Sequence, residues 1–350
     1  MFTTLAQEIH DEMFGQIGKG FFSIKLDRSG SYNFPTVQDL EITGNYVDAT
    51  VFGDILGDLT IENVADWNTV TVFGNVYGDV VNDDGWYNNV SIQGHISGDL
   101  DIEFTRGGSF SGWSVDDISA YNSSGFSYDF GSVDLLDLYR VDNSTGKVGV
   151  LEEGEVAGDN NDVFIFQLDD VLEVDSGDNN SIQILNANSA KIEVEDDATN
   201  TDINVQYGDV EVEDDGHNSH IRLGAGNDDV TVGDDASGTT LINGGAGWDV
   251  LDAEGGDTII FNNFEQVNTA GAGQNAELVA LDGIVSGYEQ VGDVFVNRAD
   301  LMSMFGFNDG HGNAVLDRNG EGSFTAIGAA DNYQLPFETP QQQQYDDLSF

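Results

Sequence analysis

The sequence contains no cysteine in 350 residues. This absence excludes disulfide bonds, thiolate catalysis and cysteine-based metal sites. Basic residues are scarce too, with 10 Lys plus Arg against 64 Asp plus Glu and a formal net charge of −54. Proteins that bind nucleic acid or anionic membranes use clusters of Lys and Arg, so we expect neither partner. No run of about 18 apolar residues is present, so we expect no membrane span.

Common hydrolase motifs are also missing. The sequence has neither the H-E-x-x-H zinc motif nor the G-x-S-x-G nucleophile elbow. His217 and His220 lie near Arg222 in the sequence and form one candidate basic site. We interpret them as side chains on an exposed corner of one turn, without a catalytic role. Glycosidases need only two carboxylates, and in so acidic a chain the presence of carboxylates is uninformative. We therefore predict no catalytic residues.

Two glycine-rich stretches carry the strongest positive signal. They read GAGNDDVT at residues 224–231 and GGAGWDVLD at residues 244–252. Both resemble G-G-x-G-x-D-x-U-x, the calcium-binding unit of RTX (repeats-in-toxin) proteins, although Leu223 replaces the leading glycine of the first copy. Glycines there allow tight turns with positive φ, and the aspartate offers hard oxygen to a cation. The resemblance implies a calcium-loaded β-solenoid that is exported by a type I secretion system.

A period close to 20 residues surrounds these units. The pairs that align are Glu173-Val174, Glu193-Val194, Glu211-Val212, Thr231-Val232 and Leu251-Asp252, at spacings of 20, 18, 20 and 20 residues. Apolar residues two apart, such as Val210 and Val212, lie on one face of a strand. Stacked turns bury a continuous core that one repeat cannot bury alone, so this period predicts a solenoid.

A second repetitive block lies nearer the N-terminus. The segments VFGDILGDL (51–59), VFGNVYGDV (72–80) and IQGHISGDL (92–100) align at spacings of 21 and 20 residues. Small residues at corners and branched residues in the core are typical of a parallel β-helix. This block resembles the repeats of bactofilins. The predicted fold class is all-β, a right-handed parallel β-helix or β-roll solenoid of about 18–21 residues per turn, with a short N-terminal capping helix and an irregular C-terminal region.

The predicted organisation has five segments. These are an N-terminal helix and cap (1–38), a parallel β-helix block (39–135), an irregular connection (136–164), an acidic RTX-like solenoid (165–268) and a C-terminal region (269–350). The last six residues, Tyr345 to Phe350, resemble the tails of type I secretion substrates. Residues 317–322 fit the first half of an EF-hand loop, but Gly328 stands where the bidentate glutamate belongs, so we interpret them as a surface turn.

Aspartates recur in register through the acidic block. Residues 152–260 contain 28 acids and two bases, a local net charge of −26, which destabilises a compact state unless it is neutralised. We predict Ca²⁺ as the neutralising cofactor. The predicted ligands are Asp175, Asp178, Asp196, Asp197, Asp214, Asp215, Asp228, Asp229, Asp234, Asp235, Asp249, Asp252 and Asp257. The alternative is a solvated acidic surface of the halophilic kind.

Aromatic residues also fall in columns. Phe52 and Phe73 share one column, which we interpret as internal packing. Trp67 and Trp86 lie about one turn apart, and the sequence leaves open whether they pack inside or dock sugar rings or a neighbouring subunit.

These features favour a non-enzymatic, calcium-stabilised structural protein of the bacterial cell surface or extracellular matrix. It would assemble with copies of itself into a layer, fibre or biofilm matrix, with a cell-surface polysaccharide bridged by calcium as a further partner. One alternative is a polysaccharide-modifying lyase or epimerase with a β-helical body and an RTX-like calcium module. Another is a cytoplasmic bactofilin-like filament.

Overall fold

A computed structural model describes residues 21–62, 64–255, 258–264 and 266–268, together with the backbone of five later strands. The chain divides into two compact units, residues 1–202 (unit 1) and residues 203–350 (unit 2), and each is described by itself. Among the described residues no helix has the length and apolar character needed to cross a bilayer. The predicted N-terminal helix, most of the EF-hand-like loop and the secretion-like tail lie outside the described residues.

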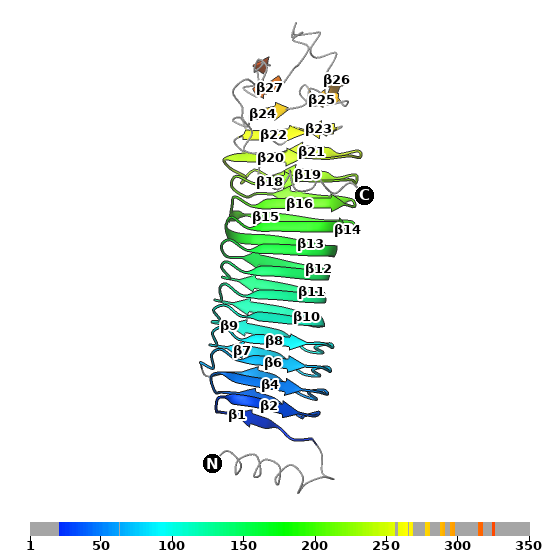
Figure 1. The fold of residues 1–350 in the computed structure, drawn as a ribbon. Coiled ribbons are helices and arrows are strands. Elements are labelled where there is room, and N and C mark those ends of the chain that lie inside the picture. Colours follow the sequence, from blue (N-terminus) through cyan, green and yellow to red (C-terminus); the bar gives the residue numbers. More distant parts are fainter. Residues whose placement is uncertain are drawn as a thin grey trace, which may run out of the picture. The chain divides into compact units, whose positions relative to one another are not determined.

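Unit 1 is built from short strands followed by long ones (Figure 1). They are β1 (Ile24–Leu26), β2 (Gly30–Phe34), β3 (Leu40–Ile42), β4 (Val47–Val51), β5 (Leu59–Ile61), β6 (Thr69–Val72), β7 (Val80–Asp83), β8 (Asn89–Ile92), β9 (Leu100–Glu103), β10 (Ser109–Tyr121), β11 (Ser127–Tyr139), β12 (Thr145–Ala157), β13 (Asp162–Asp178), β14 (Ser181–Ala187) and β15 (Ala190–Thr199).

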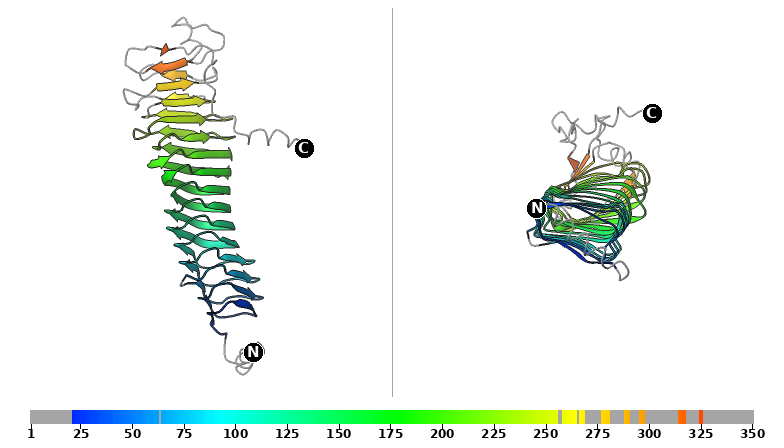
Figure 2. Two further views of the ribbon diagram at one scale, coloured as in Figure 1. Left: turned by 60° about the vertical axis from the view of Figure 1, so that its left-hand side comes forward. Right: turned by 60° about the horizontal axis from the view of Figure 1, so that its bottom comes forward.

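The strands of unit 1 form two columns of parallel pairs. The first column runs through β1, β3, β5, β7 and β9, and the second through β2, β4, β6 and β8. Strands β10 to β13 belong to both columns, because each bends within its length. We call the turn from the first column to the second the first corner, and the return turn the second corner. Figure 2 shows the same rungs of unit 1 from two further directions.

Pairing in the N-terminal block follows the predicted alignment residue for residue. Val51 pairs with Val72, which pairs with Ile92. Leu59 pairs with Val80 in the other column, and Val80 pairs with Leu100. All of these side chains are buried, since alternate residues of a strand face the interior. The predicted all-β parallel solenoid is therefore confirmed.

Polar residues also enter the interior of unit 1, at the first corner. The side-chain Oδ1 of Asn68 accepts a hydrogen bond from the Val47 amide at 2.8 Å, and Asn88 Oδ1 accepts one from the Asn68 amide at 2.9 Å. Further along, Asn161 and Asn180 continue the arrangement at 3.1 and 3.0 Å. Buried backbone donors need such partners where the chain leaves a strand, so this asparagine ladder lets the corners close.

Unit 2 also consists of strands. They are β16 (Asp202–Tyr207, which begins at the boundary), β17 (Val210–Asp214), β18 (His220–Arg222), β19 (Asp229–Val232), β20 (Thr239–Asn243), β21 (Val250–Ala253), β22 (Thr258–Asn262), β23 (Gln266–Asn268), β24 (Glu277–Ala280), β25 (Tyr288–Gln290), β26 (Phe295–Asn297), β27 (Ala314–Asp317) and β28 (Phe324–Thr325).

Two parallel columns again form the unit, β17–β19–β21–β23–β25 and β18–β20–β22–β24. Antiparallel pairs β24–β27, β25–β26 and β27–β28 follow them. Parallel stacking thus continues beyond residue 268, the predicted end of the RTX-like solenoid, through β24 and β25.

Two alignments in the acidic block need correction. We aligned Glu211 with Thr231, whereas Glu211 pairs with Asp229. We also aligned Thr231 with Leu251, whereas Thr231 pairs with Asp252. A shift of two residues keeps every side chain on its face, so alternation alone does not detect the first error. The first alignment, Glu173 with Glu193, is confirmed.

Regular strands occupy the stretch 136–164, for which we predicted an irregular connection. It contains the end of β11, all of β12 and the start of β13, which pair in parallel with one another. Register shifts between β12 and β13 mark the irregularity that the sequence does contain. The strand pattern is obscured here because glycines at 149 and 154 and acids on the outer face interrupt the apolar alternation.

Phe52 and Phe73 do not pack inside, so that interpretation was wrong. Their rings stack on each other, 5.7 Å between centroids, but 64% and 46% of the two residues are exposed. Each follows directly after its strand, β4 or β6, at the second corner. Valine and leucine fill the interior of these turns, which leaves the larger rings on the outer surface.

Candidate metal-binding site

The two glycine-rich stretches form the corners that lead into β19 and β21 in unit 2. Gly245 has a φ of 91°, and a Cβ atom there would lie 2.1 Å from the carbonyl oxygen of Gly224. Only glycine avoids both the strained φ and the clash. The Ala246 amide donates to the Gly224 carbonyl at 2.7 Å, which joins one corner directly to the next. Glycine at these positions therefore brings successive corners into close contact.

This close stacking places Asp228 and Asp249 on adjacent rungs. The two residues are 2% and 0% exposed. Asp228 Oδ1 accepts a hydrogen bond from the Val210 amide at 3.0 Å, and Asp249 Oδ1 accepts one from the Asp228 amide at 3.0 Å. Each carboxylate thus accepts a backbone amide hydrogen bond, as the ladder asparagines of unit 1 do, but it adds a negative charge to the interior.

The buried charge has an electrostatic consequence. The pKa of Asp228 is raised to about 7, mainly by burial; the negative charges of Asp249 and Asp209 contribute to this rise, and the hydrogen bond from Val210 opposes it. Desolvation and like charges both disfavour an ionised carboxyl. A cation bound beside Asp228 would reverse both effects, so near neutral pH this position favours a metal ion or a proton.

Asp214 is also buried, but hydrogen bonds surround it. It accepts bonds from the Ser219 hydroxyl at 2.6 Å, the Gly216 amide at 3.2 Å and the Thr240 hydroxyl at 3.2 Å. Burial raises the pKa of Asp214 to about 6, although these bonds oppose the rise. With both carboxylate oxygens occupied by donors, Asp214 connects the strands on either side of its corner.

The remaining predicted ligands of unit 2 lie near its surface. Burial and the charges of Glu213, Asp235 and Asp234 raise the pKa of Asp215. Burial and the charges of Asp252 and Glu211 raise the pKa of Asp229. These aspartates therefore gather in two outer groups, 215 with 234 and 235, and 229 with 252. Asp257 lies outside the described residues.

Four predicted ligands belong to unit 1. Asp175 and Asp178 lie in β13, and Asp196 and Asp197 lie in β15. The last three are exposed, whereas Asp175 is half-buried and acts on its neighbours Glu155 and Glu173, whose pKa values it raises. The register shift between β13 and β15 places Glu195 and Asp196 together across from Asp175, because Val174 pairs with Val194 and Ser176 pairs with Asp197.

The chemistry of these donors fits a hard divalent cation. Carboxylate and backbone carbonyl oxygens are the ligands that Ca²⁺ prefers, and Asp228 and Asp249 are the residues that would hold it. Among the residues that the structure describes, however, no three His, Asp or Glu side chains are grouped around one metal position. Coordination at these corners would therefore draw on two stacked carboxylates and the adjacent carbonyl oxygens.

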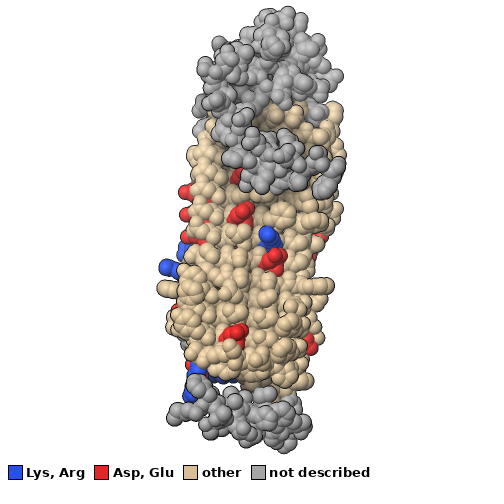
Figure 3. Space-filling model, in the orientation of Figure 1, with Lys and Arg blue, Asp and Glu red and all other residues tan. Residues whose placement is uncertain are grey.

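A carboxylate column on unit 1 was missed by our reading of the sequence. Successive rungs of the first column place Asp101, Ser119, Asp137, Glu155, Glu173 and Glu193 in one row. Burial is the largest cause of a raised pKa at Asp101, Asp137, Glu155 and Glu173. Figure 3 shows one face of the protein, where red carboxylates recur among uncharged residues and blue groups are few. The spacing of 18 residues from Asp101 to Glu173 would have revealed the row, had we recognised β11 and β12 as strands.

Comparisons with protein families, with curated proteins and with solved structures find no match to this chain.

Proposed function

We propose that this protein is a calcium-stabilised structural solenoid that acts outside the bacterial cell. The observation that carries the proposal is the stacking of Asp228 above Asp249 in two RTX-like corners, both buried and on adjacent rungs. Burying two like charges is costly unless a counter-ion accompanies them. Calcium bound at these corners would remove that cost and hold successive turns together.

The charge of the whole chain supports the same conclusion. A formal charge of −54 opposes both compact folding and the approach of a second copy. Divalent cations on the outer carboxylates, including the row from Asp101 to Glu193, would reduce this repulsion within and between molecules. We therefore propose assembly with copies of itself into a layer, fibre or matrix, in the presence of calcium and outside the cell. The resemblance to RTX proteins supports export by a type I system.

Calcium titration with two matched variants tests the binding step. Purified protein in chelator would be titrated with CaCl₂ by isothermal calorimetry, alongside Asp249→Asn and Asp235→Asn. Asp249→Asn keeps an acceptor for the Asp228 amide but removes one buried charge, whereas Asp235 is exposed. We expect Asp249→Asn to lose the tightest class of sites and Asp235→Asn to keep it. Identical isotherms for the two variants would contradict the assignment.

Assembly is tested separately by electron microscopy. Ordered polymers that form on addition of calcium and dissolve in chelator are the expected result. Filaments that form equally well in chelator would contradict a role for calcium in assembly. Monomers at every calcium concentration would contradict the structural function, while leaving the calorimetric result to decide on binding.

A further inference from the structure

The first corner of unit 1 has an unusual backbone feature. In each turn from the second onward, one residue that lies one or two positions before the second-column strand adopts a left-handed conformation. In the later turns that residue is glycine or asparagine, which tolerate positive φ: Gly107, Gly125, Asn143, Asn160, Asn179 and Asn200. Before β4, β6 and β8 it is Tyr46, Trp67 and Tyr87, with φ of 57°, 59° and 57°. Bulky side chains are strained in this conformation, so these three positions keep aromatic residues against their backbone preference.

Interior packing does not explain the aromatic residues. Tyr46, Trp67 and Tyr87 are 65%, 52% and 45% exposed. The rings of Trp67 and Tyr87 stack at 4.3 Å between centroids. Tyr87 lies over Gly107, where a Cβ atom would come within 2.6 Å of the ring. A side chain does not fit at Gly107, so the row of aromatic residues ends at Tyr87. Strained residues that the core does not use point to a function on the surface.

Arginines extend this surface beyond the rings. The Arg106 guanidinium lies over Trp86, 5.4 Å from the ring centroid, and Arg140 lies over Tyr139 at 5.1 Å. The ion pairs of the described residues include neither arginine. Both line one open pocket of ≈ 540 Å³ together with hydroxyl, amide and carboxylate groups, including Asp142 and Asp159. Two positive and two negative groups give this pocket no net formal charge.

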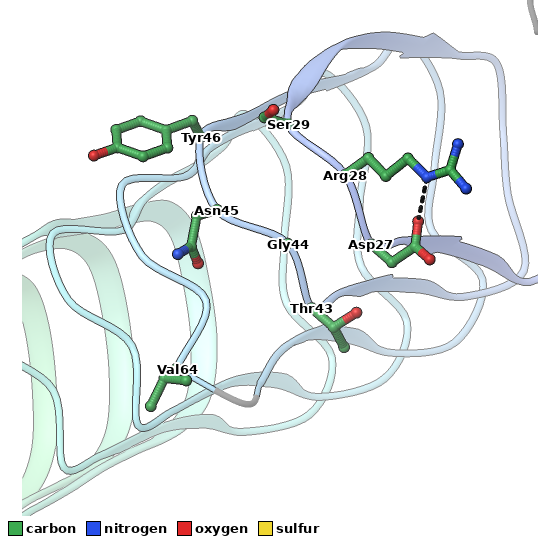
Figure 4. Close-up of a pocket in the computed structure, with 8 residues that line it drawn as sticks. All are labelled: Asp27, Arg28, Ser29, Thr43, Gly44, Asn45, Tyr46 and Val64. Atoms are coloured by element: carbon green, nitrogen blue, oxygen red, sulfur yellow. Dashed lines mark ion pairs between the residues drawn. The ribbon is translucent and has the colours of Figure 1, made fainter.

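A second open pocket, of ≈ 700 Å³, lies at the other end of the aromatic row (Figure 4). Arg28 and Asp27 line it as an ion pair at 3.7 Å, and the Tyr46 ring points away from the backbone beside it. Asn45 and Thr43 add an amide and a hydroxyl group. This pocket, too, combines hydrogen-bond donors and acceptors without net formal charge.

We propose that this surface binds a neutral polysaccharide that runs along the first corner of unit 1. The exposed edges of the stacked rings offer apolar surface with polar tips to pyranose rings, and paired donors and acceptors match the sugar hydroxyl groups. Successive rungs place binding groups every 4.7–4.9 Å or so, which suits an extended polymer of repeating sugars. The net charge of −54 repels both a polyanionic polysaccharide and a second copy of the chain. A neutral glycan is the partner that this charge does not oppose.

Glycan binding at this surface does not depend on calcium, because all of these residues belong to unit 1 and none is a predicted metal ligand. The test is therefore carried out in chelator, so that a failure here leaves the calcium proposal untouched. Native affinity electrophoresis would measure retardation of the full chain by four neutral polymers, hydroxyethylcellulose, laminarin, mannan and dextran. Alginate serves as the polyanion for comparison.

The chain itself supplies the informative variant, Trp67→Asn with Tyr87→Asn. Asparagine is the residue of the later turns at this position, so the double variant removes both rings without adding backbone strain. Its control is Phe52→Asn with Phe73→Asn, which removes the other exposed stacked pair at the second corner. A third variant, Arg106→Gln, removes the cation over Trp86.

We expect at least one neutral polymer to retard the protein and alginate to have no effect. The Trp67/Tyr87 variant should raise the dissociation constant tenfold or more with an unchanged melting temperature, Arg106→Gln should raise it several-fold, and the Phe52/Phe73 control should leave it unchanged. The proposal is overturned by retardation in alginate alone, by no retardation in any neutral polymer, or by equal loss in the control. It is also overturned if sedimentation shows that the Trp67/Tyr87 variant abolishes self-association in chelator without glycan.

Discussion

Replacing Asp228 with asparagine should stabilise the calcium-free protein at pH 8. Asparagine keeps the oxygen that accepts the Val210 amide but carries no charge, as Asn68 does in unit 1. Burial raises the pKa of Asp228 from 3.8 to about 7. A difference of roughly three pKa units between folded and unfolded states corresponds to about 4 kcal/mol, which is the largest gain we expect from the substitution.

The direction of the pH dependence follows from the same shift. Because the folded-state pKa of Asp228 lies above the unfolded value, its contribution to stability is fully present below about pH 4. That contribution is lost progressively as the pH rises through about 7. Wild-type protein in chelator should therefore lose stability between pH 4 and pH 7, and the loss should be smaller in Asp228→Asn. Asp214, with a pKa raised to about 6, contributes a loss of the same sign in both proteins.

Hydrogen exchange of the amides in β17, β19 and β21 is the assay of choice, because a solenoid opens turn by turn and a global transition averages over the turns. Asp235→Asn is the control, since it removes an exposed charge and should change the local opening free energy by less than about 0.5 kcal/mol. Calcium at a hundredfold excess over its dissociation constant should stabilise the wild type by about 2.7 kcal/mol and Asp228→Asn by less. If Asp228→Asn in chelator at pH 8 exchanges as fast as the wild type, the argument from the buried charge is wrong.

Three further predictions follow from the corners and columns. Gly245→Ala should lower the free energy of unfolding by about 1–3 kcal/mol, because φ is 91° and the new Cβ would meet the Gly224 carbonyl; denaturant titration against the exposed Ala246→Ser checks this. Asn161→Ala should cost about 2–4 kcal/mol, since it removes the acceptor of the Ser144 amide and the donor to the Val141 carbonyl, whereas exposed Asn188→Ala should cost under about 0.5 kcal/mol. Glu155→Gln should raise the melting temperature at pH 7 and low salt by relieving repulsion with Asp137 and Glu173, and a gain that persists undiminished in 1 M NaCl would argue against an electrostatic cause.

The repeat period is the feature of the fold that sequence could predict. Rows of branched aliphatic residues such as Val51, Val72 and Ile92 align only at one spacing, and the structure pairs them as expected. Where acids rather than apolar residues recur, the same reasoning failed. Glu211 was assigned to Thr231 instead of Asp229, because both choices keep valines inside. Alternation determines which face a residue occupies. It does not determine which residue of the next rung is its partner, because a shift of two residues preserves the face.

The candidate site was predictable only in part, for a related reason. The RTX-like units identify Asp228 and Asp249 from local spacing, and both are buried at stacked corners. Whether an acid faces a metal, a hydroxyl or solvent depends instead on the rung above it. Asp214 was predicted as a ligand like the others, yet Ser219 and Thr240 donate hydrogen bonds to it from its own corner and from β20. Such partners lie 5 and 26 residues away, and no local motif specifies them.

Corners, rather than strands, carry the chemistry of this chain. Strand interiors are filled by interchangeable aliphatic residues, whereas each turn offers the same few corner positions to a different side chain. One corner position of unit 1 holds Tyr46, Trp67 and Tyr87 in three early turns and glycine or asparagine in later ones, with a left-handed backbone in each of these turns. In unit 2, a corner carries Asp228 and Asp249 where asparagine would satisfy the same amides without charge. Because asparagine meets the structural requirement in both places, we propose that what they bind explains the aromatic and acidic residues. A chain with asparagine at all of these positions should therefore fold at least as stably as the wild type in chelator, and should have lost both calcium and glycan binding.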